Sequence, residues 1–171
     1  LILTKPIGTG AINTAVKRGA ASEAVIEACI AAMTTSSAAA SKAMTEIGAN
    51  GCTDVTGFGL LGHAYEMAKA SGVTFTIESS AVPLLPETLE LIGQGMLTRG
   101  DRNNRAYVGD TIEFDAAVSG VMQSALFDPQ TAGGLLISLE EEKAERYLSK
   151  FQAARKIGRV EKAEDYLIKV E

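Results

Sequence analysis

The stretch Cys52-Thr53-Asp54-Val55-Thr56-Gly57-Phe58-Gly59-Leu60-Leu61-Gly62-His63 decides how the rest of this chain is interpreted. Its carboxylate, Asp54, comes two residues before the hydroxyl of Thr56, and the apolar spacing of a helix begins after two glycines. A turn of this kind presents backbone N–H groups to an anion and a carboxylate to a cation. The residue types therefore indicate a metal–phosphate site, with Asp54 as the candidate ligand. The structural alternative, which residue type alone favours, is an Asx-type turn or cap that merely starts the helix.

A single carboxylate makes a poor magnesium site, because magnesium usually takes one or two carboxylates together with phosphate oxygens and waters. We therefore expect the partner carboxylates of Asp54 to come from outside this sequence. His63 is the only histidine, and a packed or surface helix residue is the alternative to a catalytic base there. No Ser or Cys has a His and Asp partner pattern, so nucleophilic catalysis is unsupported and no catalytic residue is assigned. Cys52 is interpreted as a small buried hydrophobe.

Composition excludes several classes of partner. The 171 residues carry a net charge of −5 and are 46% hydrophobic, which gives a buried core but no broad attraction to nucleic acid or an anionic membrane. Glu23, Glu27 and Lys42 interrupt the alanine-rich region, so no membrane span is expected. Cys29 and Cys52 lack CxxC spacing and are expected to be free thiols in a reducing, cytoplasmic compartment.

The domain organisation is expected to be simple. No internal repeat and no long linker divides the chain, so residues 1–171 are expected to form one domain. The sequence starts at Leu1, in the middle of an expected strand, and not at Met. We therefore expect it to be a piece of a longer protein, with residues upstream.

Hydrophobic periodicity predicts alternating strands and helices. The predicted strands are 1–4, 73–77 (half-buried), 111–114, 135–139, 157–161 and 166–170. The predicted helices are 11–19, 22–34, an alanine-rich segment ending at Ile47, one from the glycines after Asp54 to Ser71, 87–93, 115–125 and 140–156. Residues 95–106 are polar and rich in Asn and Arg, so they are predicted to be a loop. Mixed strands with helices between them indicate an α/β (α+β) sandwich, with helices packed on a mixed β-sheet.

Two further segments are candidates for phosphate binding. Thr9, between Gly8 and Gly10, lies in a turn that can cradle a phosphate, although such a short turn is weak evidence. In the predicted loop 95–106, Arg102 and Arg105 can clamp phosphates and Asn104 can hydrogen-bond, with a solvated loop as the alternative. Neither GxxxxGK[ST] nor GxGxxG occurs, so neither a P-loop nor a Rossmann site is indicated.

Three motifs together resemble the C-terminal half of the selenophosphate synthetase (selenide, water dikinase) family. They are Lys5-Pro6-Ile7-Gly8-Thr9-Gly10, the stretch Thr53 to His63, and Asp128-Pro129-Gln130-Thr131-Ala132-Gly133-Gly134-Leu135-Leu136. Their order and spacing fit across essentially the whole chain. The family belongs to a superfamily of ATP-using enzymes that includes aminoimidazole ribonucleotide synthetase, and the resemblance implies that superfamily's C-terminal α/β sandwich.

The resemblance implies an activity and partners. The full enzyme makes selenophosphate, AMP and phosphate from ATP, selenide and water, and works with its own N-terminal domain, as a homodimer. Asp54 matches the C-terminal Mg²⁺ ligand, and Thr9 and Asn104 are implied near the ATP phosphates. The family's reactive Cys or selenocysteine and its catalytic Lys lie in the N-terminal half, and neither cysteine here matches that nucleophile. The fragment alone is therefore expected to be inactive.

The chain departs from the family pattern at two places. Ala132 stands where the family usually has Ser, and Gly100-Asp101 stand where it often has Gly-Thr. Asp101 puts a negative charge in the segment that would face a phosphate. The alternatives are a sister enzyme of the thiamine-monophosphate kinase or aminoimidazole ribonucleotide synthetase type, or a non-catalytic nucleotide-binding or dimerisation module.

Overall fold

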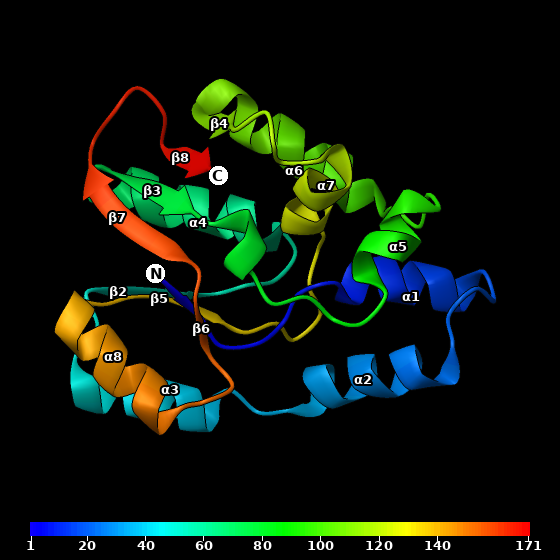
Figure 1. Ribbon diagram of the computed structural model, residues 1–171, viewed down its shortest axis with the longest axis horizontal. Helices are drawn as coiled ribbons and strands as arrows, with labels where there is room; N and C mark the ends of the chain where they lie inside the picture. Colours follow the sequence, from blue (N-terminus) through cyan, green and yellow to red (C-terminus); the bar gives the residue numbers. More distant parts are fainter.

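A computed structural model describes residues 1–171, and its strands form two four-stranded sheets (Figure 1). The first sheet has the order β2-β5-β1-β6, and all its pairs are antiparallel. Its strands are β1 (Ile2–Leu3), β2 (Gly51–Asp54), β5 (Leu135–Ser138) and β6 (Arg155–Lys156). Because β2 lies at the edge, Asp54 ends a strand with one unpaired side.

The second sheet has the order β4-β8-β3-β7 and is mixed. Strand β8 runs parallel to β3 and to β4, while β7 runs antiparallel to β3. Its strands are β3 (Val73–Ile77), β4 (Ile112–Phe114), β7 (Gly158–Lys162) and β8 (Ile168–Val170). The chain crosses from the first sheet to the second at Ile157, whose backbone N–H donates to the Leu1 carbonyl at 2.9 Å.

The chain also has eight α-helices and two short 3-10 segments, which lie on and beside the sheets (Figure 1). The helices are α1 (Thr9–Lys17), α2 (Glu23–Thr34), α3 (Ala38–Ile47), α4 (Gly59–Ser71), α5 (Thr88–Gly93), α6 (Arg99–Val108), α7 (Gly120–Phe127) and α8 (Glu141–Lys150), and the 3-10 segments are η1 (Ser79–Ala81) and η2 (Gly109–Thr111). The α/β sandwich with helices on its sheets is therefore confirmed, with the strands divided between two sheets.

Three clusters of buried apolar side chains hold these layers together. The largest joins both sheets through α4, and it includes Leu3, Leu61, Phe75, Leu136 and Val170. A second cluster packs α3 and α8 on the other face of the first sheet. The third cluster joins α1, α2 and α5. Each fully buried aliphatic side chain stabilises the fold by about 1.5–3 kcal/mol relative to an exposed one.

Two predicted helix ends are confirmed in detail. Ser22 caps α2, and its hydroxyl accepts from the Val25 backbone N–H at 3.4 Å. Gly72 ends α4 in the left-handed conformation, with φ 62° and ψ 42°, which glycine adopts at little cost. Local sequence signals therefore determine these two ends.

The prediction of a loop over 95–106 is wrong, because Arg99–Val108 form helix α6. The side chain of Thr98 caps this helix by accepting from the Asp101 backbone N–H, and Arg105 pairs with Asp101 one turn later. These local contacts stabilise a helix whose composition is polar. Packing against α4 and α7 adds the tertiary support that polarity does not indicate.

The predicted helix 140–156 is too long. Helix α8 ends at Lys150, and Phe151 leaves the helical region with φ −126° and ψ 79°. Arg155 and Lys156 instead pair with Leu3 and Ile2 as strand β6. The chain therefore exchanges helical hydrogen bonds for sheet hydrogen bonds.

Three other predictions need correction. The helix predicted at 115–125 begins only at Gly120, because the Ser119 side chain caps it by accepting from the Met122 N–H. Strand β3 is not half-buried, since the segment before β8 covers Thr74, whose hydroxyl donates to the Tyr166 carbonyl. Phe58 is 44% exposed and does not belong to the buried face of α4. Strand β2 was not predicted, because its four residues include glycine and aspartate.

No single helix is long and apolar enough to cross a membrane. The bent pair α2 and α3, at 49° to each other, reaches the required length and composition only when both are taken together.

Candidate functional site

Asp54 is the last residue of β2, where it pairs with Leu135 of β5. Its side chain is exposed, and no hydrogen bond or ion pair from within the chain involves its carboxylate; only its main-chain oxygen is an acceptor, from the Thr53 hydroxyl. Helix α4 begins at Gly59 without a side-chain cap. The alternative that Asp54 caps the helix is therefore wrong. The carboxylate is free to bind a ligand.

The turn that follows Asp54 is held on several sides by distant segments. The Val55 N–H donates to the Gly134 carbonyl at 2.8 Å, and the Thr56 carbonyl accepts from the Gln130 N–H at 2.9 Å. Gly133 lies so close to this turn that a Cβ atom there would be 2.1 Å from the Val55 carbonyl oxygen. The motif from Asp128 to Leu136 is thus the platform on which residues 54–58 rest.

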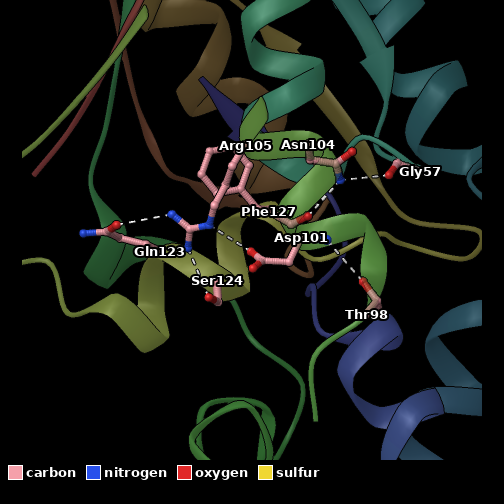
Figure 2. A network of polar contacts seen from close by, with 8 residues as sticks. All are labelled: Gly57, Thr98, Asp101, Asn104, Arg105, Gln123, Ser124 and Phe127. Carbon is pink, nitrogen blue, oxygen red and sulfur yellow. Dashed lines mark hydrogen bonds and ion pairs between the residues drawn. The ribbon is translucent and has the colours of Figure 1, made fainter. Parts of the chain in front are cut away.

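Helix α6 supplies the other support (Figure 2). Asn104 is only 4% exposed, and its side-chain amide donates to the carbonyls of Gly57 and Phe127, both at 3.0 Å. The structure thus places Asn104 at the turn but with its amide donors engaged within the chain. A contact between Asn104 and a nucleotide stays a prediction.

The Arg105 guanidinium is also engaged within the fold (Figure 2). It pairs with Asp101 at 3.2 Å, donates to the side chains of Gln123 and Ser124, and lies 4.7 Å from the centre of the Phe127 ring. Such a guanidinium is unavailable as a free phosphate clamp, and the negative charge of Asp101 is paired with it. Arg102 is exposed.

Thr9 lies in a buried network that joins the motif from Lys5 to Gly10 with the motif from Asp128 to Leu136. Its hydroxyl donates to Gln130 Oε1 at 3.1 Å and accepts from the Thr131 N–H at 2.9 Å. Gln130 Oε1 also accepts the backbone N–H groups of Gly8 and Thr9. Because Thr9 is 2% exposed and its hydroxyl is occupied, a direct phosphate contact would require this network to rearrange.

Asp128 completes the same network from within the fold. Its Oδ2 accepts from the Gly10 N–H at 2.9 Å and from Gln130 Nε2 at 3.0 Å, so it supplies a negative charge at the start of α1. Burial raises the pKa of Asp128 to about 6, against the opposing effect of the N–H donors of Ala11, Gly10 and Gln130. A Cβ atom at Gly10 would be 2.4 Å from Asp128 Oδ1, so glycine is required there.

Lys5 links helix α2 to Ala132, which belongs to the motif from Asp128 to Leu136. Its ammonium donates to the carbonyls of Ala32 at 3.2 Å and Ala132 at 2.9 Å, and burial lowers its pKa. Ala132 itself has a positive φ of 50°, which is uncommon for a residue with a side chain. Ala132 is exposed.

His63 and Thr56 meet beside Asp54. His63 Nε2 and Thr56 Oγ1 are 3.1 Å apart, and the imidazole lies 5.5 Å from the Phe58 ring. Burial lowers the pKa of His63, while the negative charges of Asp54 and Glu66 raise it. The sequence placed these residues in one motif, but their spacing alone did not indicate the contact.

Cys52 is exposed, so its interpretation as a buried hydrophobe is wrong. The edge position of β2 leaves its outward-facing side chains uncovered. The residue is exposed, but its thiol is partly shielded from water, and this desolvation together with the charge of Asp54 raises the pKa of the Cys52 thiol, which disfavours the reactive thiolate. Cys29 is buried, and both cysteines are free thiols.

The two main cavities lie away from Asp54. One, of about 690 Å³, is at the opposite end of β2 and is lined by Leu1, Asn50, Gly51 and Lys156 among others. Another, of about 280 Å³, lies between α2, α3 and Lys5. Asp54 lines neither of these cavities.

The residues near Asp54 can supply part of the ligand set of a magnesium site. A free carboxylate is a suitable oxygen ligand, but no group of three His, Cys, Asp or Glu side chains in this chain could hold a metal ion. The donor set is therefore incomplete and requires oxygens from a substrate or from another segment.

Sequence reasoning missed the organising residues of the site. Gln130 and Asp128 were quoted within a motif, yet nothing local indicated that they bind the Gly8–Gly10 turn. The sequence signal that could have marked them is the motif itself, in which Gln130 follows Pro129 and comes three residues before the glycine pair.

Comparison with known proteins shows to which family the chain belongs. The domain family described as AIR synthase related protein, C-terminal domain, matches residues 1–171. A selenide, water dikinase of Caldanaerobacter subterraneus subsp. tengcongensis is 41% identical over 99% of this chain and 51% of its own length. One from Geobacter metallireducens is 44% identical over 87% of this chain and 43% of its own. The chain thus spans about half the length of the curated relatives it matches.

Solved structures show the same fold at lower identity. The hydrogenase maturation protein HypE of E. coli has a TM-score of 0.66 at 19% identity, over 95% of this chain and 44% of its own. The thiamine monophosphate kinase of Aquifex aeolicus has a TM-score of 0.63 at 20% identity, over 99% of this chain and 48% of its own. The chain therefore belongs to the family of AIR synthase related protein C-terminal domains, and its sequence is similar to those of selenide, water dikinases.

Proposed function

We propose that this chain is the C-terminal domain of a selenide, water dikinase, which makes selenophosphate, AMP and phosphate from ATP, selenide and water. The observation that carries the proposal is the free, exposed Asp54 carboxylate at the end of β2, on a turn held by the third motif and α6. Relatives about 40% identical over nearly the whole chain support this activity over that of a sister enzyme. The fold alone does not select it, because structural neighbours include both HypE and a thiamine monophosphate kinase.

Asp54 would contribute one oxygen ligand to Mg²⁺ bound with the phosphates of ATP. The cation, when bound, neutralises charge on the phosphates during phosphoryl transfer. The residues around Asp54 position its carboxylate. Gln130 and Asn104 hold the backbone of the turn, so that the carboxylate points outward. An exposed carboxylate is what one wall of a shared active site requires.

The remaining ligands, the reactive Cys or selenocysteine and the catalytic Lys would come from an N-terminal domain, and the enzyme would act as a homodimer. Residues 1–171 would be inactive alone. The free thiols of Cys29 and Cys52 support a reducing, cytoplasmic location.

Asp54→Asn in the full-length enzyme tests the proposal. Selenide-dependent formation of AMP from ATP should fall by at least about 100-fold, since a metal-binding charge is lost at a phosphoryl-transfer site. Circular dichroism and the unfolding midpoint should stay unchanged, because the carboxylate accepts no hydrogen bond within the chain. The matched control is Asp165→Asn, an exposed carboxylate in the segment between β7 and β8.

Full activity in Asp54→Asn would refute the metal role. AMP formation by residues 1–171 alone, from ATP and selenide, would refute the division between two domains. If the full-length enzyme phosphorylates thiamine monophosphate and ignores selenide, the sister-enzyme alternative is correct.

A further inference from the structure

The hydroxyl of Thr56 and the imidazole of His63 form a side-chain pair next to Asp54, with Oγ1 and Nε2 3.1 Å apart. We infer that Thr56 is a second oxygen donor toward the cation held by Asp54, and that His63 is the residue that positions its hydroxyl. This inference rests on the proposed function and adds to it two residues of this chain.

The backbone places Thr56 on the same side as Asp54. The Val55 N–H bonds to the Gly134 carbonyl, so the chain stays in register with β5 beyond the end of β2. Val55 is fully buried, whereas Asp54 is exposed and Thr56 is half-buried. Because successive side chains of an extended chain point to opposite faces, the side chains of Asp54 and Thr56 point away from the core, on the face opposite Val55.

Hydrogen bonds hold both the carbonyl and the side chain of Thr56. Its carbonyl accepts two hydrogen bonds, from the N–H of Gly59 at 3.0 Å and of Gln130 at 2.9 Å. A β-branched side chain on a fixed backbone has few χ1 choices, and the bond to His63 selects one of them. The hydroxyl is therefore preorganised.

His63 is held in turn by its own neighbours. Its ring lies 5.5 Å from Phe58, at 52°, and Phe58 stacks on Tyr107 at 4.9 Å with the ring planes nearly parallel. The aromatic rings fix the imidazole plane, so Nε2 stays directed at Thr56.

This arrangement suits an oxygen ligand. A hydroxyl has one donor hydrogen and two acceptor lone pairs. With the His63 proton on Nδ1, Nε2 accepts the Thr56 hydrogen, and both lone pairs of the hydroxyl are left for a cation or its bound water. Magnesium prefers oxygen donors, and one carboxylate does not complete its site. Thr56 thus supplies an oxygen that the acidic side chains of this chain do not.

Because the donor set of residues 1–171 alone is incomplete, the test uses the full-length enzyme with ATP, and Mn²⁺ as a paramagnetic probe of the cation site. Nuclear magnetic resonance would follow the broadening of the Val55 and Thr56 amide signals as Mn²⁺ is added. Thr56→Val, which keeps the shape and removes the hydroxyl, should raise the Mn²⁺ concentration for half-maximal broadening about five-fold, as the loss of one polar contact implies. Thr56→Ser should restore the wild-type value.

A second variant and a matched control separate positioning from folding. His63→Ala should weaken the Mn²⁺ response about as much as Thr56→Val, and in the wild type Mg²⁺ should shift the His63 Nε2 resonance. Thr53→Val removes a neighbouring hydroxyl that bonds only the Asp54 carbonyl, and should leave the response unchanged. Unchanged exchange of the Gly59 and Gln130 amides would show that the turn is intact.

The Mn²⁺ responses of the variants distinguish the role of Thr56 and His63 from that of Asp54. If Thr56→Val and His63→Ala respond like wild type while Asp54→Asn loses the response, the inference is overturned and the metal role of Asp54 stands. If Asp54→Asn also keeps the response, the cation does not bind at this turn. Both the inference on Thr56 and His63 and the metal role of Asp54 are then refuted.

Discussion

The side-chain amide of Asn104 donates to the main-chain carbonyl of Gly57 at 3.0 Å, across 47 residues of sequence (Figure 2). The same amide donates to the Phe127 carbonyl, so one buried group joins the Asp54 turn, α6 and the end of α7. A residue expected to contact a nucleotide thus acts first as an internal support of the turn that carries the candidate ligand.

Asn104→Ala should lower the free energy of unfolding by about 2 kcal/mol. The variant leaves the Gly57 and Phe127 carbonyls without their donor, and an unsatisfied buried polar group costs about 1–3 kcal/mol. Urea denaturation measures this change. Arg102→Ala, an exposed residue of the same helix, is the control and should change stability by less than about 0.5 kcal/mol. Equal effects of the two variants would contradict the supporting role.

Thr98→Ala should destabilise helix α6 by about 1 kcal/mol. The Thr98 hydroxyl accepts from the Asp101 N–H, and loss of such a cap typically has this cost. Amide exchange of residues 99–105 would report it as faster local opening. Thr98→Ser keeps the hydroxyl and should behave like wild type; if it behaves like Thr98→Ala, the cap is not what starts the helix.

Gly133→Ala should be destabilising by more than about 2 kcal/mol. Its new Cβ would lie 2.1 Å from the Val55 carbonyl oxygen, so the 54–58 turn would have to move off its platform. Gly57→Ala is the matched control within the turn, because a Cβ there meets no atom within 4 Å. Thermal unfolding of both variants measures the difference. A tolerated Gly133→Ala would mean that the turn is not tightly seated.

Asp128 should make the fold more stable as the pH falls from about 6 to about 4. Its pKa is raised to about 6 in the fold, against 3.8 in the unfolded chain, so within this window the folded state binds the extra proton. The gain integrates to about 2–3 kcal/mol. Because other groups titrate in the same range, the quantity to measure is the free energy of unfolding of wild type minus that of Asp128→Asn.

This difference should rise towards acid pH whatever its value at pH 7, since asparagine does not titrate. Carboxyl resonances in a carbon-13 titration give the pKa directly. Gln130→Ala should raise that pKa further, because it removes a donor to the charged form. A flat difference between pH 4 and pH 7 would show that Asp128 is not buried as described.

Local signals identified most elements of the fold. Ser22 before an apolar run and Gly72 after one marked real helix ends, because capping involves residues close in sequence. Helix α6 was missed, since its polar surface resembles a loop and its support comes from α4 and α7. Residues 155–156 were assigned to a helix, because only pairing with β1 makes them a strand.

The sequence by itself determined the family, the α/β class and Asp54 as the candidate ligand, since these depend on residue types at fixed spacing. It did not determine how the three motifs meet. Thr9 and Gln130 are 121 residues apart, yet Gln130 holds the first motif while its backbone supports the Asp54 turn. Long-range hydrogen bonds have no local periodicity. Only the tertiary structure therefore decided that Asp54 is left free while Thr9 and Asn104 are engaged within the fold.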